Sequence, residues 1–264
     1  MMQFSSVHPN ARIAANVEIG PYCYIAENVE IGEGCVIGPH VTIFDYVKIG
    51  KNCKIFPGAV IGAIPQDMKY SGEVTWVEIG NNTVIRECAT VNRGTAASGK
   101  MLTKIGDNCL IMSYAHVAHD CRIGNHVIQV SYVGLAGETD VDDWAIIGGG
   151  SLAHQFTRIG MHAMIQGGSK IAKDVPPYAL VGRSPLSFCG LNNVGLRRRG
   201  FTNEQIDRIR EIYRIIYNSG LNRSDACLEV EREVPPCIER DNILNFIRAS
   251  KGGIVKYSDL SADD

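Results

Sequence analysis

The stretch IAANVEIGPYCYIAENVEIGEGCVIGPHVTIFDYVKIGKNCKIFPGAVI, residues 13–61, carries an isoleucine at every sixth position without a break. Neither a helix, with a period of 3.6 residues, nor a flat strand, with a period of 2, produces a six-residue repeat. A chain that turns a corner every six residues and buries one aliphatic side chain on each face does produce it. Three such faces close a coil of eighteen residues, so the pattern predicts a hexapeptide β-helix.

The repeat begins at Val7 and continues, with two interruptions, to Ile171. A small residue follows each aliphatic residue by four positions, as a narrow packed interior requires. A glycine often follows the aliphatic residue directly, and we attribute it to a corner with unusual backbone angles. These glycines are Gly20, Gly32, Gly38, Gly50, Gly62, Gly80, Gly106 and Gly124.

The two interruptions predict loops. Ile61 and Ile79 stand eighteen positions apart and keep the phase of the repeat, so we interpret residues 63–77 as one coil pushed out as a loop. Residues 92–104 shift the phase and therefore form a true insertion. Loops on a solenoid often decorate one functional side.

The repeat ends near Pro176-Pro177, and helical signals follow it. Thr202 to Gln205 form a capping-box signature, and apolar residues continue at helical spacing to Asn218. Two more helices are expected near 224–233 and 238–248. We therefore predict a mainly β domain over 1–190 and a helical domain over 191–264. The helices would cover the open end of the solenoid.

Composition excludes several classes of protein. The 264 residues carry a formal net charge of −2, which gives no general attraction to nucleic acid or anionic membranes. No apolar run reaches membrane-spanning length and no secretory signal precedes the repeat, so we expect a cytoplasmic protein. Five of the nine cysteines occupy the small inward position, and we expect them to be reduced and structural. They are Cys23, Cys35, Cys53, Cys109 and Cys121.

The densest polar departure from the repeat is Ser113 to Cys121, SYAHVAHDC. His119 falls at a corner where a side chain points outward, and Asp120 could accept a hydrogen bond from its ring. A histidine oriented by a carboxylate is a general-base arrangement. Residues eighteen apart stack in columns, which places His119 over Gly137 and Gly137 over Gln155. Because Gly137 could give its N–H to an oxyanion, the column favours acyl transfer.

Other chemistry stays open at this level. His116 and His119 have the spacing of a metal pair but no evident third ligand. The run Arg197 to Arg199 suits either a solvated surface or a phosphate. A non-catalytic scaffold would need neither the His119 column nor the loops.

Seven strings are more specific than the repeat: IPQDMKY (64–70), RGT (93–95), AHVAHDC (115–121), AIIGG (145–149), HQF (154–156), DVPPY (174–178) and GLRRRGF (195–201). On these strings the chain resembles, along its whole length, the UDP-N-acetylglucosamine acyltransferases. The resemblance implies a left-handed parallel β-helix, an exception to right-handed crossovers. It also implies a homotrimer with active sites between subunits.

The reaction implied by the resemblance is the first step of lipid A biosynthesis. A (R)-3-hydroxyacyl chain passes from acyl carrier protein to the glucosamine 3-OH of UDP-N-acetylglucosamine. No metal or diffusible cofactor takes part. His119 matches the general base of the family, Asp120 its orienting group and Gly137 the oxyanion donor.

Binding residues are also implied by the resemblance. Positions that hold the nucleotide sugar are Asp67, Lys69, His116, His154 and Gln155. Asn192, Arg198 and Arg199 match positions near the nucleotide and pantetheine, and Gly167 matches the floor of the acyl pocket. Glu138 stands in the binding layer where the best-known members have histidine, and Val194 replaces an acidic residue. Glu138 keeps a 3-amino UDP-sugar acceptor as an alternative, and a zinc hydratase of solenoid fold is a more distant one.

Overall fold

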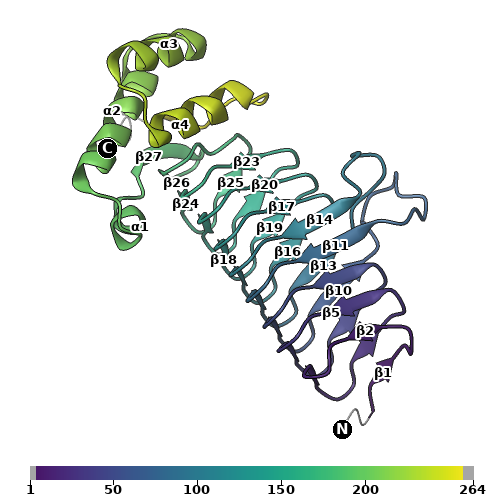
Figure 1. The fold of residues 1–264 in the computed structure, drawn as a ribbon. Helices are drawn as coiled ribbons and strands as arrows, with labels where there is room; N and C mark the ends of the chain where they lie inside the picture. Colours follow the sequence, from purple (N-terminus) through teal and green to yellow (C-terminus); the bar gives the residue numbers. More distant parts are fainter. Residues whose placement is uncertain (1–3, 258–264) are drawn as a thin grey trace.

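The computed structural model describes residues 4–257, which form a three-sided column of stacked coils with helices at its C-terminal end (Figure 1). Each side is one sheet, called here face A, B or C. Face A contains β1 (Ser6–Val7), β4 (Tyr24–Ile25), β7 (Thr42–Ile43), β10 (Val60–Ala63), β13 (Thr90–Asn92), β16 (His116–Val117), β19 (Gly134–Leu135), β22 (Leu152–Ala153) and β25 (Lys170–Ile171).

Face B follows face A along the chain. It contains β2 (Arg12–Ile13), β5 (Val29–Ile31), β8 (Val47–Ile49), β11 (Trp76–Ile79), β14 (Leu102–Ile105), β17 (Arg122–Ile123), β20 (Asp140–Val141) and β23 (Arg158–Ile159).

Face C completes each coil. It contains β3 (Glu18–Ile19), β6 (Val36–Ile37), β9 (Lys54–Ile55), β12 (Val84–Ile85), β15 (Leu110–Ile111), β18 (Ile128–Gln129), β21 (Ile146–Ile147), β24 (Met164–Ile165) and β26 (Ala179–Gly182). The hairpin strand β27 (Ser187–Leu191) is antiparallel to β26, and β28 (Lys256–Tyr257) pairs with β27.

The repeat explains this architecture. Within uninterrupted coils, strands pair in parallel with partners eighteen residues away, such as His116 with Gly134 and Gly134 with Leu152. The isoleucines of the repeat from Ile25 onward point inward and are buried. Burial of each aliphatic side chain contributes about 1.5–3 kcal/mol, so the stacked interior drives the fold. The five inward cysteines are buried free thiols, as predicted.

Both loops leave the column at the corner between faces A and B. Ile61 pairs with Val91, thirty residues away, which is twelve more than one coil. Our interpretation of residues 63–77 as a whole displaced coil is therefore wrong, because β10 leads directly into β11. A twelve-residue insertion is two repeats long and leaves the phase unchanged. The loop at 92–104 is an insertion, as predicted, since Thr90 pairs with His116, twenty-six residues away.

The glycines after the aliphatic residues are required by crowding rather than by backbone angles, which corrects our prediction. Of the eight, Gly62 alone has a positive φ. At Gly106 a Cβ would lie 2.5 Å from the carbonyl oxygen of Gly124 in the next coil. The left-handed conformation instead falls three places after the aliphatic residue, as at His40 (φ 57°) and Asp120 (φ 59°).

The repeat continues one face beyond Pro176-Pro177, because Val181 of β26 pairs with Ile165 of β24. Four helices follow among the described residues: α1 (Asn193–Arg198), α2 (Asn203–Asn218), α3 (Arg223–Glu233) and α4 (Ile238–Ala249). The predicted capping box of α2 is present, with Thr202 and Gln205 bonded reciprocally. Helix α1 was not predicted from the sequence, because its six residues are too few to show a helical period.

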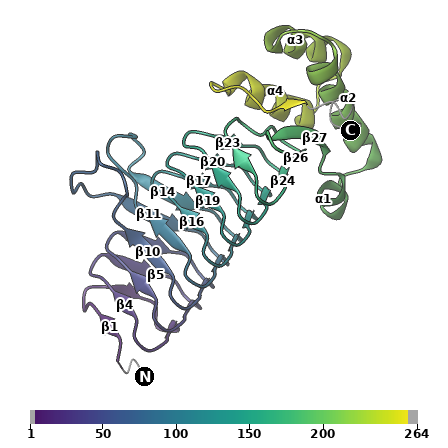
Figure 2. The same cartoon turned by 180° about the vertical axis from the view of Figure 1, so that it is seen from behind.

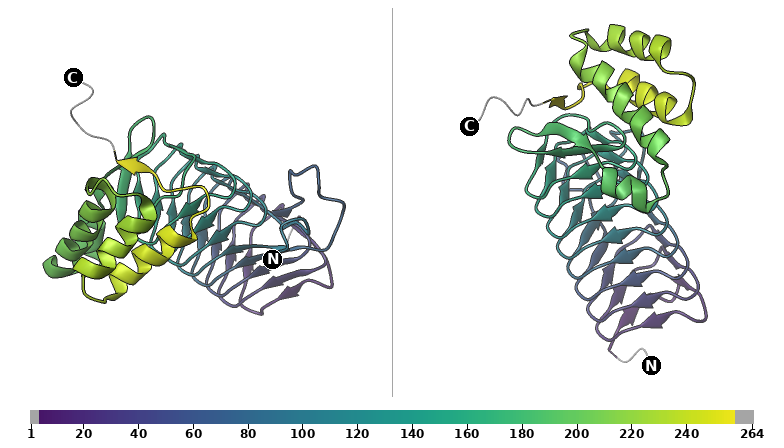
Figure 3. Two further views of the ribbon diagram at one scale, coloured as in Figure 1. Left: turned by 90° about the horizontal axis from the view of Figure 1, so that it is seen from above. Right: turned by 90° about the vertical axis from the view of Figure 1, so that its left-hand side faces the viewer.

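The helices pack on the last coils, as Figures 2 and 3 show from other directions. The Tyr213 hydroxyl donates to the Pro177 carbonyl at 2.5 Å. The Arg158 guanidinium lies over the Phe246 ring, 4.3 Å from its centre. These contacts cover the open end of the solenoid. No helix in residues 4–257 is long and apolar enough to cross a membrane.

Candidate active site

The polar segment singled out in the sequence lies directly beside the two inserted loops. His119 and Asp120 form the corner between β16 and β17. The two preceding coils insert their loops at the same corner, between β10 and β11 and between β13 and β14, and the loops project from the column there (Figure 1). The polar segment therefore lies at the same corner as both inserted loops.

Asp120 orients the His119 ring. The His119 Nδ1 lies 2.8 Å from Asp120 Oδ2, and the Asp120 side chain is fully buried. Burial alone would raise the pKa of Asp120, but hydrogen bonds from Ser98, His119 and Thr95 outweigh it and hold the pKa below its ordinary value. The carboxylate is thus ionised at neutral pH and can accept a hydrogen bond from the Nδ1–H, which leaves the Nε2 lone pair available as a base.

Gly137 lies directly beneath the His119 ring, so the predicted column is present. A Cβ at residue 137 would lie 2.4 Å from both Cε1 and Nε2 of His119. The Gly137 N–H donates to no backbone or side-chain acceptor among the described residues, whereas the adjacent Glu138 N–H donates to the His119 carbonyl. A donor without a partner next to a base is the arrangement that an oxyanion requires.

His116 stands on face A beside His119. Its Nδ1 lies 2.7 Å from the Thr90 hydroxyl. Burial, and to a lesser extent the neighbouring His119, lowers the pKa of His116. His116 is therefore neutral at pH 7 and suits hydrogen bonding to a substrate rather than proton uptake.

A groove runs from His119 along face A. A cavity of about 500 Å³ is lined by His116, His119, Gly137, Leu152 and Gln155, among others. A second cavity of about 420 Å³ shares Leu152 and Gln155 and extends to His154, Lys170 and Ala172. Most of the shared lining is aliphatic, so the groove combines a polar end at His119 with an apolar floor.

Asp67 of the first loop also faces the histidine. Its Oδ2 lies 3.9 Å from His119 Nε2, which is beyond hydrogen-bond distance. The Lys69 N–H donates to Asp67 Oδ1, while the Lys69 side chain is exposed and contributes nothing to the lining of the two face-A cavities. The His154 Nδ1 lies 3.2 Å from the Gln155 carbonyl, and both side chains are exposed.

In the single chain, four of the predicted binding residues lie away from the His119 groove. Asn192 is buried and caps α1, because its Oδ1 accepts the Gly195 N–H. Arg198 is exposed at the end of α1, and Arg199 lies over the Trp144 ring at 5.2 Å. Gly167 lies at the corner between faces C and A, across face A from His119. A single chain does not bring these residues to His119.

The residues that support Asp120 were not predicted from the sequence. Thr95 and Lys100 of the second loop both bond to it, Thr95 at the carboxylate and Lys100 at the main-chain carbonyl. The only available signal was Thr95 within the RGT string. No group of three or more histidine, cysteine, aspartate or glutamate side chains that could hold a metal converges within residues 4–257.

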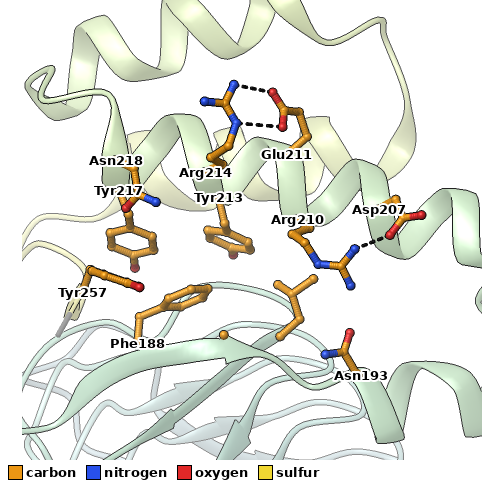
Figure 4. A pocket seen from close by; sticks show the side chains of 12 residues that line it. Phe188, Asn193, Asp207, Arg210, Glu211, Tyr213, Arg214, Tyr217, Asn218 and Tyr257 are labelled. Atoms are coloured by element: carbon orange, nitrogen blue, oxygen red, sulfur yellow. Dashed lines mark hydrogen bonds and ion pairs between the residues drawn. The ribbon is translucent and has the colours of Figure 1, made fainter. Parts of the chain in front are cut away.

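A further cavity, of about 410 Å³, lies between β27 and α2 (Figure 4). Its floor is aromatic, with Phe188 4.6 Å from Tyr217 between ring centres. Arg210 and Arg214 at its rim pair with Asp207 and Glu211. Its lining contains no histidine and so lacks the pairing of a ring nitrogen with a free N–H that is present at His119.

The fold and this corner define an acyltransferase of the hexapeptide-repeat class. A profile described as "Bacterial transferase hexapeptide (six repeats)" matches residues 10–45 and 102–128. A second profile, "Udp N-acetylglucosamine O-acyltransferase; Domain 2", matches residues 174–255. This second match extends from the last coil through the helices.

Comparison with individual relatives identifies one family within the hexapeptide-repeat acyltransferases. The chain is 46% identical over 250 residues to an acyl-[acyl-carrier-protein]–UDP-N-acetylglucosamine O-acyltransferase of Thiobacillus denitrificans, covering 95% of this chain and 96% of that one. It is 44% identical over 254 residues to the enzyme of the same name from Janthinobacterium, covering 95% and 97%. The chain therefore belongs to the UDP-N-acetylglucosamine O-acyltransferase family, as its motifs predicted.

Solved structures agree with this assignment. The UDP-N-acetylglucosamine acyltransferase of Bacteroides fragilis superposes with a TM-score of 0.95 at 50% identity, covering 97% of this chain and all of that one. The enzyme of Francisella novicida gives 0.94 at 40% identity, covering 100% and 99%. The predicted fold class, a left-handed parallel β-helix with a C-terminal helical part, is confirmed.

Gly137→Ala is expected to displace the His119 ring, because the new methyl group would lie within 2.4 Å of it. We expect acyltransferase activity to fall about a hundredfold or more, as misplacement of a catalytic group by about 1 Å can do. A structure of the variant and its turnover rate are the measurements. Gly252→Ala, where a Cβ meets nothing within 4 Å, is the control. Full activity with an unmoved ring would contradict the expectation.

Proposed function

We propose that this chain transfers a (R)-3-hydroxyacyl group from acyl carrier protein to the glucosamine 3-OH of UDP-N-acetylglucosamine. The observation that carries the proposal is the corner itself, in which His119 lies 2.8 Å from a buried carboxylate and directly over the free N–H of Gly137. The donor and acceptor are those named for relatives that share up to 46% of aligned residues over 95% of the chain.

The mechanism follows from the arrangement of these groups. His119 Nε2 takes the proton of the sugar 3-OH as its oxygen attacks the thioester carbonyl carbon. The tetrahedral oxyanion accepts the Gly137 N–H. The intermediate then collapses, the carbon–sulfur bond breaks, and the pantetheine thiolate receives the proton from His119. Asp120 stays ionised throughout and stabilises the imidazolium.

The groove fits the two substrates. Its apolar lining, including Gly134, Leu152 and Ala153, suits an acyl chain that leaves from the thioester beside His119. The polar side chains near the histidine suit the sugar, and we assign Asp67, His116 and Gln155 to this role. We assign Lys69, Glu138 and His154 to the outer part of the same acceptor site. Asn192, Arg198 and Arg199 would meet the nucleotide and pantetheine phosphates.

We also propose a homotrimer in which neighbouring chains complete each site. Every strand of face B carries a charged outward residue, to which β11 and β14 add Trp76 and Leu102; the charged residues are Arg12, Glu30, Lys48, Glu78, Lys104, Arg122, Asp140 and Arg158. From β12 onward the outward residues of face C are all apolar: Val84, Leu110, Ile128, Ile146, Met164 and Leu180. A continuous apolar column on one face indicates a partner surface, and an adjacent copy would bring Gly167 and Arg198 toward a His119 that is not their own.

The compartment proposed is the cytoplasm. All nine cysteines are free thiols, and five of them fill the interior of the solenoid. Free thiols throughout a folded chain fit a reducing compartment.

A 3-amino UDP-sugar is a second candidate acceptor. The Glu138 carboxylate follows Gly137 directly and makes no ion pair among the described residues. An unpaired carboxylate beside the attacking group would favour an amine over a hydroxyl. Assay of both acceptors with the same acyl donor decides between them, and a clear preference for the amine would replace the hydroxyl assignment.

His119→Ala is expected to lower kcat about 10²–10⁴-fold, because the reaction loses its general base. Turnover with UDP-N-acetylglucosamine and acyl carrier protein donors is the measurement. His8→Ala, at an exposed site on the first coil, is the control. Near-normal turnover in a folded His119→Ala protein would remove His119 from the mechanism.

Ile128→Glu should disrupt the trimer, because it places a charge in the apolar column of face C. Light scattering should show the wild-type trimer reduced to smaller species, with activity lost because each groove is incomplete alone. Arg122→Glu, which introduces the same glutamate on face B, is the control and should leave the trimer intact. A wild-type enzyme that is active as a monomer would exclude this assembly.

Gly167 is expected to set the length of the acyl chain. With no side chain at this position, the enzyme should prefer donors of about fourteen carbons or more over ten-carbon donors, since each buried methylene contributes ~0.8 kcal/mol. Gly167→Met should shorten the preferred chain, as measured by kcat/KM across a donor series. Gly252→Met serves as the control. An unchanged profile in Gly167→Met would reject Gly167 as the ruler.

A further inference from the structure

The second loop holds the carboxylate that orients the base. Asp120 Oδ2 accepts the Thr95 hydroxyl at 2.7 Å, and both carboxylate oxygens lie 3.0 Å from the Thr95 main-chain nitrogen. Thr95 is 1% exposed. With the contacts from His119 and the nearby Ser98, these bonds surround the carboxylate with donors, and Thr95 alone supplies both a main-chain and a side-chain donor.

Toward Asp120 the Thr95 hydroxyl acts as a donor. Its oxygen accepts the Ser98 N–H at 3.4 Å, and its own hydrogen is directed to Asp120 Oδ2. If Asp120 were protonated, its carboxyl proton would face a hydrogen-bond donor of Thr95 at either oxygen. The arrangement therefore requires an ionised Asp120 that accepts from His119.

Other contacts fix the loop in this position. The Lys100 ammonium bridges the Asp120 carbonyl and the Asp140 carboxylate, at 3.1 Å to each. At Gly94 a Cβ would lie 2.8 Å from Asp120 Oδ1, so the chain passes too close for any side chain. The Ala96 N–H donates to Glu73 of the first loop at 2.9 Å. Both loops are thus tied to the carboxylate.

We infer that Thr95 is a positioning residue for the reaction, which keeps Asp120 as an acceptor and thereby fixes the proton of neutral His119 on Nδ1. The inference rests on the proposed acyl transfer. Thr95 acts through Asp120 and His119 and touches neither substrate. It is separate from substrate binding, so its loss affects turnover and not affinity.

Kinetics of Thr95→Val test the inference, because valine keeps the shape and removes the hydroxyl. We expect kcat to fall about ten- to a hundredfold, the range of one hydrogen bond to a charged group. KM for both substrates should stay within about twofold. Thr95→Ser should recover most of kcat. Thr83→Val, which removes an equally buried and bonded hydroxyl in the core, is the matched control.

Two kinetic results would overturn the inference. One is wild-type kcat in Thr95→Val, and the other is an equal loss in the serine and valine variants. A wild-type protein with no acyl transfer would instead reject the proposed function. If Thr95→Val does not fold, ¹⁵N-histidine spectra of the wild type decide. Neutral His119 must carry its proton on Nδ1, and a dominant Nε2–H form would overturn the inference.

Discussion

Everything in this protein depends on the stacking of inward residues from coil to coil. A narrow three-sided interior admits one large and one small side chain on each face, so the chain must return to the same position every eighteen residues. Backbone hydrogen bonds between coils, such as those that pair His116 with Gly134, then fix equivalent residues one strand spacing apart. Insertions are tolerated only at corners, where the chain can extend outward without breaking the backbone hydrogen bonds between strands of successive coils.

The candidate site arises where one corner departs from this pattern. Glu138 and Phe156, one and two coils beyond Asp120, share its positive φ but are partly or fully exposed. Asp120 is fully buried because the second loop covers it. The His119 ring could not lie over the next coil if residue 137 carried a side chain. Two departures, an insertion and a glycine, thus convert a solvated corner into a buried carboxylate that orients a histidine ring.

The sequence predicted the strands and the corner well, because a six-residue period determines which side chains point inward. It could not locate the first insertion, whose twelve residues preserve the phase. The sequence also could not show why residue 106 is a glycine. A side chain there would collide with Gly124 of the next coil, and local backbone angles do not require the glycine. Thr95 lies twenty-five residues from Asp120, and only the folded loop brings its hydroxyl to the carboxylate.

The three faces differ in a way that links assembly to chemistry. Face B carries a charged outward residue on every strand and suits solvent, whereas the outward residues of face C from Val84 to Leu180 are apolar and suit another copy. Face A carries the groove but lacks, within one chain, the arginines and Gly167 that the family motifs assign to binding. If face C packs against a neighbour, the edges of face A are brought against that neighbour too. The apolar column that would hold the copies together would then also complete the groove. A substitution on face C, far from His119, would in that case change which substrates the groove binds.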